Sequence, residues 1–154
     1  MKEVTWRTAT KEDALYVADR LREADRIEVA AMGVTPRQAV EWSRQLSDHA
    51  WVGLIDGVPS MMFGCGCNLV SDAAEVWALG TDNCTSSPRE MLVYGRKIVK
   101  MILDIYPRLQ NHCDARYTAA HRWLKKLGFT VHKPEPHGVH GEEFCKITIS
   151  KGDA

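Results

Sequence analysis

The sequence predicts an α/β (α+β) domain built on a mixed, mostly antiparallel sheet of six to seven strands, flanked by about four helices. Three observations predict it. Helix start signals recur along the chain, short apolar or alternating runs separate them, and two of these runs meet at Asp56-Gly57, a dipeptide typical of tight hairpins. The expected element order is β, α, α, β, β, β, α, β, α, β, β. A chain of 154 residues has the usual length of one domain, so we expect a single domain over 1–154.

Three of the expected helices begin with the same signal. A hydroxyl residue at the N-cap is followed three positions later by a side chain that can reach back to the N-cap backbone. The three starts are Thr10 with Asp13, Thr35 with Gln38, and Ser87 with Glu90. Proline follows two of these caps, at a position where a missing N–H costs nothing. A fourth helix is expected from about Thr118 to Gly128, because glycine suits the left-handed residue that ends a helix.

Seven apolar or alternating runs are expected to form strands. They cover 4–8, 50–55, 58–67, 73–80, 109–113, 129–132 and 144–149. The run 73–80 is apolar on both faces, as a central strand would be, with the exception of Glu75. The segment 132–141 is rich in proline and glycine, so we expect it to be a loop.

Charge and cysteine content narrow the range of partners. Twenty basic and twenty acidic residues cancel, and no run of five like charges occurs, which argues against nucleic acid and a membrane surface as partners. No apolar run approaches the ~20 residues that span a bilayer, and the amino terminus carries charges where a signal peptide is apolar. Five cysteines in irregular spacings indicate free thiols in a reducing compartment, so we expect a cytoplasmic protein.

The turn after the run 73–80 is the segment best suited to chemistry. A strand that ends in a polar turn, followed at once by a helix, directs free backbone N–H groups and the positive end of the helix dipole at one point. Such a point suits an anion, particularly a pyrophosphate. Thr85, Ser86 and Ser87 add hydroxyl groups there, and Arg89 adds positive charge. The alternative is that these residues only cap the helix.

Two segments, AEVWALGT (74–81) and RYTAAHRWLKKLGF (116–129), resemble the GNAT superfamily of acyl-CoA-dependent N-acyltransferases. In its order of elements the resemblance spans nearly the whole chain. A closer resemblance is to small GNAT-like proteins of short-tailed phages (podoviruses), some of them described as internal virion proteins. It rests on the spacing of Leu109, Asn111, Arg122, the run 123–125 and Gly128, and on the ending KITISKG.

The resemblance implies a cofactor, acetyl-CoA or CoA, whose pantetheine arm lies between the strands at 73–80 and 109–113. It implies cofactor contacts at Ala78, Leu79, Gly80, Cys84, Thr85, Ser86, Ser87, Arg89 and Asn111. It also implies that Glu75 is the general base, and a carboxylate in an apolar strand suits the removal of a proton from an amine. The alternative is that Glu75 faces solvent or pairs with an arginine.

The sequence departs from the GNAT pattern at two places. The segment 83–88 has no glycine, whereas a glycine-containing phosphate loop is usual at this position, so the contacts to the CoA phosphates are weakened. Leu124 stands where many members have the tyrosine that protonates the leaving thiolate. Tyr117, Tyr94 and Cys84 are possible substitutes, and the sequence does not choose among them.

Two functions from different classes follow from these residues. The first is an acyl-CoA-dependent N-acyltransferase. We expect it to be phage-encoded and to act on a small-molecule or protein amine. The second is a GNAT-shaped phage protein without turnover, which binds a host bacterial protein in the host cytoplasm or is a component of the virion. A zinc site is the least favoured alternative, because His137 and His140, with His132 and Cys145 nearby, lack the cysteine pairs of a zinc motif. We therefore expect no metal.

Overall fold

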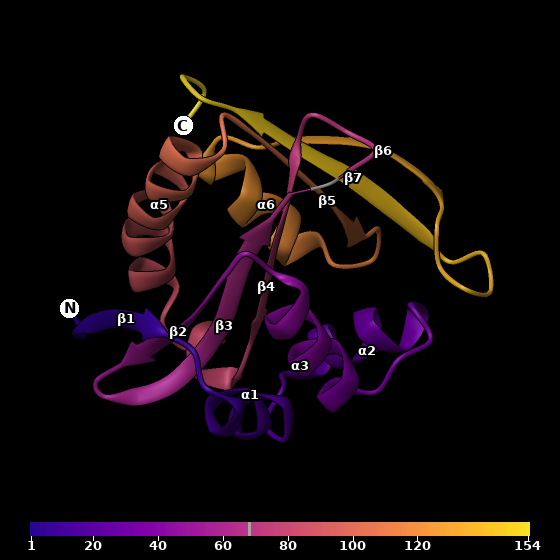
Figure 1. Cartoon of the computed structure of the whole chain (residues 1–154). Coiled ribbons are helices and arrows are strands. Elements are labelled where there is room, and N and C mark those ends of the chain that lie inside the picture. Colours follow the sequence, from indigo (N-terminus) through magenta and orange to yellow (C-terminus); the bar gives the residue numbers. More distant parts are fainter. Residues whose placement is uncertain (68) are drawn as a thin grey trace.

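The computed structural model describes residues 1–67 and 69–154 and contains one seven-stranded sheet in that part of the chain. Its elements are β1 (Val4–Thr8), α1 (Lys11–Ala18), α2 (Glu23–Ala31), α3 (Pro36–Leu46), β2 (His49–Ile55), β3 (Val58–Gly66), β4 (Ala74–Gly80), α4 (Asp82–Thr85), α5 (Pro88–Ile105), β5 (Arg108–Asp114), α6 (Thr118–Leu127), β6 (Thr130–Pro136) and β7 (Glu143–Ser150). The predicted fold class is confirmed (Figure 1).

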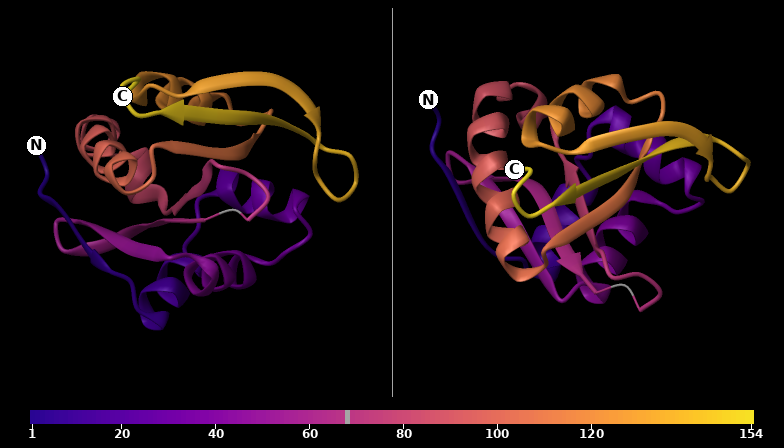
Figure 2. Two further views of the ribbon diagram at one scale, coloured as in Figure 1. Left: turned by 45° about the horizontal axis from the view of Figure 1, so that its top comes forward. Right: turned by 90° about the horizontal axis from the view of Figure 1, so that it is seen from above.

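The sheet has the strand order β1-β2-β3-β4-β5-β7-β6, and its two central strands, β4 and β5, are parallel. All other neighbours are antiparallel. Only two residue pairs join β4 to β5, Ala74 with Leu109 and Glu75 with Gln110. The two strands then separate, so that β1–β4 and β5–β7 form two half-sheets. The left view of Figure 2 shows the β6–β7 hairpin (yellow) well apart from β1 and β2 at the other edge.

Local signals place most of the elements where the sequence predicts them. Thr10 and Thr35 form complete capping boxes, and Gly128 ends α6 with a φ of 109°. Asp56 and Gly57 have φ angles of 48° and 78°, which gives the β2–β3 turn the positive values that a tight hairpin requires. The two predicted capping boxes and the predicted hairpin are therefore confirmed.

The capping box predicted at Ser87 and Glu90 is wrong. The short helix α4 immediately precedes it, so the Ser87 N–H donates to the carbonyl of Cys84, 3.1 Å away. The Ser87 hydroxyl accepts from Lys2 Nζ at 2.9 Å instead of capping α5. Glu90 is buried, and its Oε2 atom has no hydrogen-bond partner within the described residues.

Three further differences concern elements that the sequence did not predict correctly. Helices α2 and α4 were not expected, so the described part of the chain has six helices rather than about four. Strand β6 runs on to Pro136 and takes in part of the segment predicted to be a loop. β6 is an edge strand with an irregularity between Val131 and Pro134, and both features let a strand contain proline.

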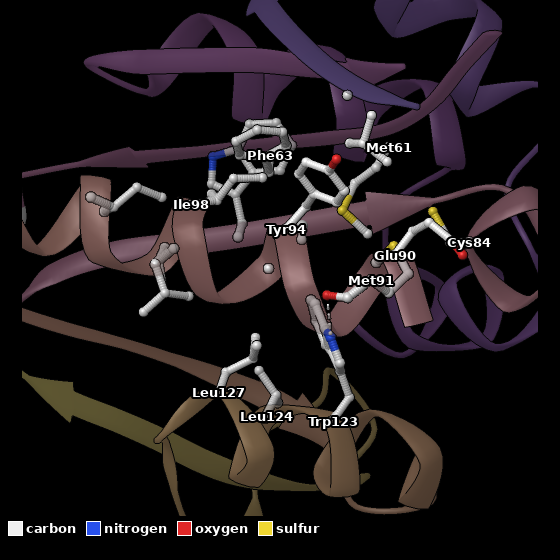
Figure 3. A pocket seen from close by; sticks show the side chains of 18 of the residues that line it. Met61, Phe63, Cys84, Glu90, Met91, Tyr94, Ile98, Trp123, Leu124 and Leu127 are labelled. Atoms are coloured by element: carbon white, nitrogen blue, oxygen red, sulfur yellow. Dashed lines mark hydrogen bonds between the residues drawn. The ribbon is translucent and has the colours of Figure 1, made fainter. Parts of the chain in front are cut away.

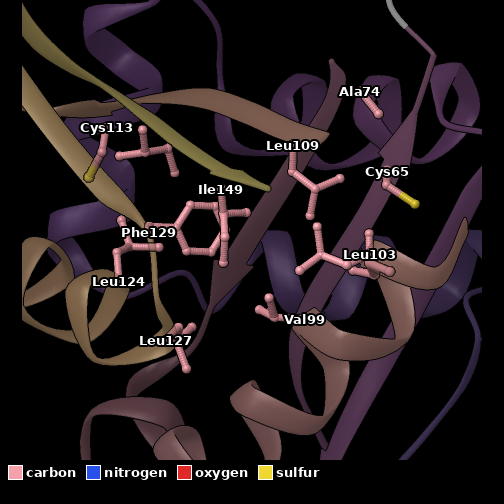
Figure 4. Close-up of a cluster of buried hydrophobic side chains, with 12 residues drawn as sticks. Cys65, Ala74, Val99, Leu103, Leu109, Cys113, Leu124, Leu127, Phe129 and Ile149 are labelled. Atoms are coloured by element: carbon pink, nitrogen blue, oxygen red, sulfur yellow. The ribbon is translucent and has the colours of Figure 1, made fainter. Parts of the chain in front are cut away.

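Helices cover both faces of the sheet. On one face α5 and α6 pack on a cluster of buried residues that includes Leu103, Leu109, Phe129 and Ile149 (Figure 4). On the other face α1 and α3 pack on a second cluster around Val52 and Met62. The five cysteines are free, and none of the described helices is long and apolar enough to cross a membrane.

Candidate functional site

The separation of β4 from β5 leaves part of the β4 edge without a partner strand. In an antiparallel pair, backbone groups of alternate residues point to opposite sides, so Val76, Ala78 and Gly80 direct their N–H and C=O groups away from β3. The Val76 carbonyl accepts from the Asn111 side-chain amide. The Gly80 N–H and carbonyl are also occupied, by groups of α2. Of these three residues, Ala78 is therefore the one left facing the opening.

Helix α2 closes the wide end of this opening. Asp25 Oδ2 accepts from the Gly80 N–H at 2.7 Å, and the Arg22 N–H donates to the Gly80 carbonyl at 3.0 Å. Asp25 also accepts from Arg22 Nε at 3.0 Å, and both side chains are largely buried. Burial raises the pKa of Asp25, and its ion pair with Arg22 opposes that rise. Gly80 and Leu79 were predicted to pair with a cofactor arm, and those contacts remain a prediction.

Three hollows follow one another along the separation of the half-sheets. The helix cleft, of about 500 Å³, lies between α4–α5 and α6. The core cavity, of about 120 Å³, lies beneath α5. The α2 cleft, of about 520 Å³, lies between α2, α3 and the edges of β4 and β5. Cys84, Met91 and Trp123 line both the helix cleft and the core cavity, and Trp77 and Ala78 line both the core cavity and the α2 cleft. The core cavity therefore shares lining residues with each of the two clefts and lies between them.

The core cavity is predominantly apolar, as Figure 3 shows for side chains that converge from β3, α5 and α6. Trp123 Nε1 donates to the Met91 carbonyl at 3.0 Å and joins α6 to α5 across it. Cys84 Sγ lies 3.1 Å from the carbonyl oxygen of Ser60. Burial raises the pKa of Cys84 to about 11, so this cysteine stays a thiol at neutral pH and is not an activated nucleophile.

In the turn before α5, four backbone amides already have acceptors within the chain. The N–H groups of Asn83, Cys84 and Ser86 donate to Thr81 or Asp82, and that of Ser87 donates to Cys84. Thr85, Ser86 and Arg89 are exposed beside this turn, whereas Ser87 is buried. Lys2 Nζ adds a cation close to Ser86 and Ser87. Of the groups named here, the hydroxyls and the cationic side chains are the ones that could still contact an anion.

Two cationic side chains of α6, Arg122 and Lys126, line the helix cleft, and both are exposed. They were not predicted as cofactor contacts, because cationic residues at helical spacing usually indicate only a solvated face. Tyr117, just before α6, also lines this cleft. Burial raises the pKa of Tyr117, so its hydroxyl keeps its proton at neutral pH. Tyr94 lines the core cavity, and Cys84 lines both hollows.

Glu75 lies at the narrow end of the opening and lines the α2 cleft. It is half-buried, and its Oε1 atom accepts from Gln110 Nε2 at 3.1 Å. The structure thus puts Glu75 beside the opening, as the sequence suggested, and its role as a base remains a prediction.

A second carboxylate, Glu28, lines the same cleft from α2. Its Oε2 atom accepts from the Asp114 N–H at 2.9 Å. Burial raises the pKa of Glu28 to about 7, against the opposing effect of this hydrogen bond. Sequence reasoning missed Glu28 because it missed α2, and the only available signal was the run EADRIEVAA (23–31), which has no capping residue before it.

Two histidines complete one wall of the α2 cleft. The rings of His112 and His137 stack with centroids 3.8 Å apart, and His112 Nε2 lies 3.6 Å from Glu135 Oε1. Burial, followed by the neighbouring His137, lowers the pKa of His112. His137 belongs to the predicted histidine loop, but the described residues contain no group of three or more metal-ligating side chains placed to hold an ion.

The buried carboxyl of Glu28 makes stability depend on pH. Its pKa is about 7 in the folded chain against 4.5 in the reference state, so its contribution to the free energy of unfolding is greatest below pH 4.5 and is lost as pH rises to 7. The loss is roughly 3 kcal/mol at most, at 1.36 kcal/mol per pKa unit. We expect Glu28→Gln, compared with the parent in urea denaturation, to gain relative stability between pH 5 and pH 8. If the difference in unfolding free energy between variant and parent were the same at pH 5 and pH 8, the raised pKa would be contradicted.

No protein-family profile matches the chain, and no curated protein matches its sequence. Its similarity to solved structures is extensive. A GNAT-family acetyltransferase from Bacillus anthracis matches with a TM-score of 0.73 and 13% identity, over 99% of this chain and 98% of that one. A spermidine N-acetyltransferase, a chimera of Vibrio cholerae SpeG and hSSAT, has a TM-score of 0.69 and 12% identity, over 97% and 96%. AAC(6')-Ib in complex with ribostamycin and coenzyme A has a TM-score of 0.68 and 13% identity, over 98% and 95%. The chain therefore has the GNAT fold.

Proposed function

We propose that this protein transfers an acetyl group from acetyl-CoA to an amine by direct attack, without a covalent intermediate on the protein. The observation that carries the proposal is the backbone of Ala78, which has no partner strand on its β5 side among the described residues and lies where the core cavity meets the α2 cleft. An extended arm with amide groups can pair with such an edge as a further strand would. Bound acetyl-CoA would supply an acyl group already activated as a thioester.

The residues around the helix cleft fit the rest of the cofactor, with one difference from the predicted set. The N–H groups of residues 83, 84, 86 and 87 are already engaged, so phosphate contacts fall to the side chains of Arg122, Lys126 and Arg89. Lysine contributes a point charge and arginine a planar set of N–H donors. We expect these contacts to hold phosphate less firmly than a full set of backbone N–H groups does. We therefore propose CoA binding through Ala78 and this cationic rim.

Glu75 is the proposed base. The acceptor amine enters from the α2 cleft and loses a proton to Glu75, its nitrogen forms a bond to the acyl carbon, and the carbon–sulfur bond breaks. The departing thiolate takes a proton from solvent or from Tyr117, which keeps its proton at neutral pH and lines the helix cleft. The names of two similar structures, a spermidine N-acetyltransferase and an aminoglycoside acetyltransferase, support a small-molecule amine as acceptor.

A second candidate is a GNAT-fold protein that binds a partner without turnover. The engaged amides before α5 and Leu124, at the usual position of the tyrosine acid, favour it. A host bacterial partner and a place in the virion belong to this candidate, and the proposed relationship to short-tailed phages is common to both candidates. Neighbouring genes of phage origin would support that relationship, and a retained fold does not by itself imply a retained activity.

A thermal-shift titration with CoA and acetyl-CoA tests the first candidate. At a hundredfold excess over Kd, a ligand that binds only the folded chain should raise Tm by about 5–10 °C for a domain of this size. Arg122→Gln should lower the affinity, whereas Lys100→Gln, an exposed cation on α5 that lines none of the three hollows, should not. No shift at millimolar CoA would make the second candidate the leading one.

A further inference from the structure

The α2 cleft has a volume of about 520 Å³, within the range of small-molecule sites. Its walls come from α2, α3, the edges of β4 and β5, and His137 in the β6–β7 turn. The walls are of two kinds, one acidic and one apolar. The combination limits which acceptor the cleft can hold.

The acidic wall consists of Glu28 and Glu75, one at each side of the opening between β4 and β5. No lysine or arginine lines the cleft in the part of the chain that the structure describes. His112 does not offset these charges, because its lowered pKa favours the neutral ring. The wall therefore attracts a cation and repels a carboxylate or phosphate.

The apolar part of the lining comes from the end of α2 and from α3. Met32, Trp42 and Leu46 line the cleft and are 40%, 50% and 84% exposed. Trp77 forms its floor, held in place because its Nε1 donates to Ser47 Oγ at 2.7 Å. Apolar side chains gathered at a hollow, unlike apolar residues scattered singly, mark a binding surface.

We infer that the acceptor is a primary amine with an apolar or aromatic body. Its ammonium group would lie by Glu28 and Glu75, and its body would cover Trp42, Met32 and Leu46. The inference rests on the proposed acyl transfer for the presence of an amine. The preference itself is a property of the cleft and can be measured without any cofactor.

The test is a binding titration at pH 8, where a carboxyl with the pKa of Glu28 is ionised. The four probes are 2-phenylethylamine, 2-phenylethanol, 3-phenylpropionate and spermidine. The binding of each is measured by calorimetry or protein NMR. The aromatic amine should bind at least about tenfold more tightly than the alcohol, since a hydrogen bond to a charged group contributes this much or more. The carboxylate should not bind. Spermidine, which has charge without an aromatic body, should bind more weakly than the aromatic amine.

Two variants locate the binding. Glu28→Gln should weaken the aromatic amine about tenfold and leave the alcohol unchanged, and Trp42→Ala should weaken both about threefold to tenfold. Their controls are Glu12→Gln on α1 and Ile105→Ala on α5, which remove an exposed carboxylate and an exposed apolar group away from the cleft. The controls should bind as the parent does.

Three results would overturn the inference. These are spermidine binding as tightly as the aromatic amine, the carboxylate binding as tightly as the aromatic amine, or the alcohol binding as tightly as the aromatic amine. A failure of the proposed function gives a different result. In that case CoA does not change Tm, while the order of affinities among the four probes is as expected. If CoA raises Tm but the order of affinities differs from the expected one, the inference is wrong and the proposed function is not affected.

Discussion

Replacing Glu75 with glutamine should lower turnover about 10²- to 10⁴-fold, the range that general base catalysis usually contributes. Glutamine keeps an oxygen that can accept from Gln110 Nε2, so the contact across the narrow end of the opening survives. The fold and the CoA-induced thermal shift should therefore stay as in the parent. Steady-state kinetics with acetyl-CoA and an accepted amine would measure the loss in kcat.

The comparison that isolates Glu75 is with Glu28→Gln, which removes the other carboxylate of the same cleft. If Glu75 is the base, its variant loses kcat, while the Glu28 variant loses mainly affinity for the amine. Unchanged turnover in Glu75→Gln would exclude it as the base. A large loss of kcat in Glu28→Gln alone would transfer the role to Glu28.

Asp25→Ala should lower the free energy of unfolding by about 3–5 kcal/mol, because removal of one partner leaves a buried charge uncompensated. The Arg22 side chain is only 16% exposed, and Asp25 is its ion-pair partner. The same change removes the acceptor of the Gly80 N–H. Urea denaturation monitored by circular dichroism would measure the loss.

The matched control is Asp19→Ala, which breaks an exposed ion pair with Arg37. The side chains of Arg37 and Asp19 are 63% and 44% exposed, so this change should cost about 1 kcal/mol or less. Equal losses in the two variants would show that the contact between α2 and Gly80 contributes nothing beyond a surface ion pair.

The parts of the fold that the sequence predicts correctly are those with local causes. A capping box joins residues three positions apart, as at Thr10 and Thr35, and a tight turn needs only the backbone freedom of Asp56-Gly57. Glu75 stands out for a local reason as well, since it is the one charge in an apolar strand. Short-range patterns such as these are readable from the sequence.

The parts that escaped prediction have long-range causes. Helix α2 begins at Glu23, its N-cap residue Arg22 makes no side-chain cap, and the helix is held by Gly80, more than fifty positions away. Glu28 was missed together with this helix. The expected box at Ser87 was lost because α4 and Lys2 supply partners that no local pattern contains. Tertiary contacts override local preference at each of these points.

Helix α2 touches both half-sheets at the end where they diverge. Its Asp25 holds Gly80 of β4, and one turn later its Glu28 holds Asp114 of β5. The helix thus spans the two arms of a V whose apex is the pair Glu75 and Gln110. A ligand N–H that donates to the Glu28 carboxylate would compete with the Asp114 N–H for it. The nine residues of α2 thus supply one carboxylate to the lining of the α2 cleft and also the side-chain contacts that join the helix to both half-sheets.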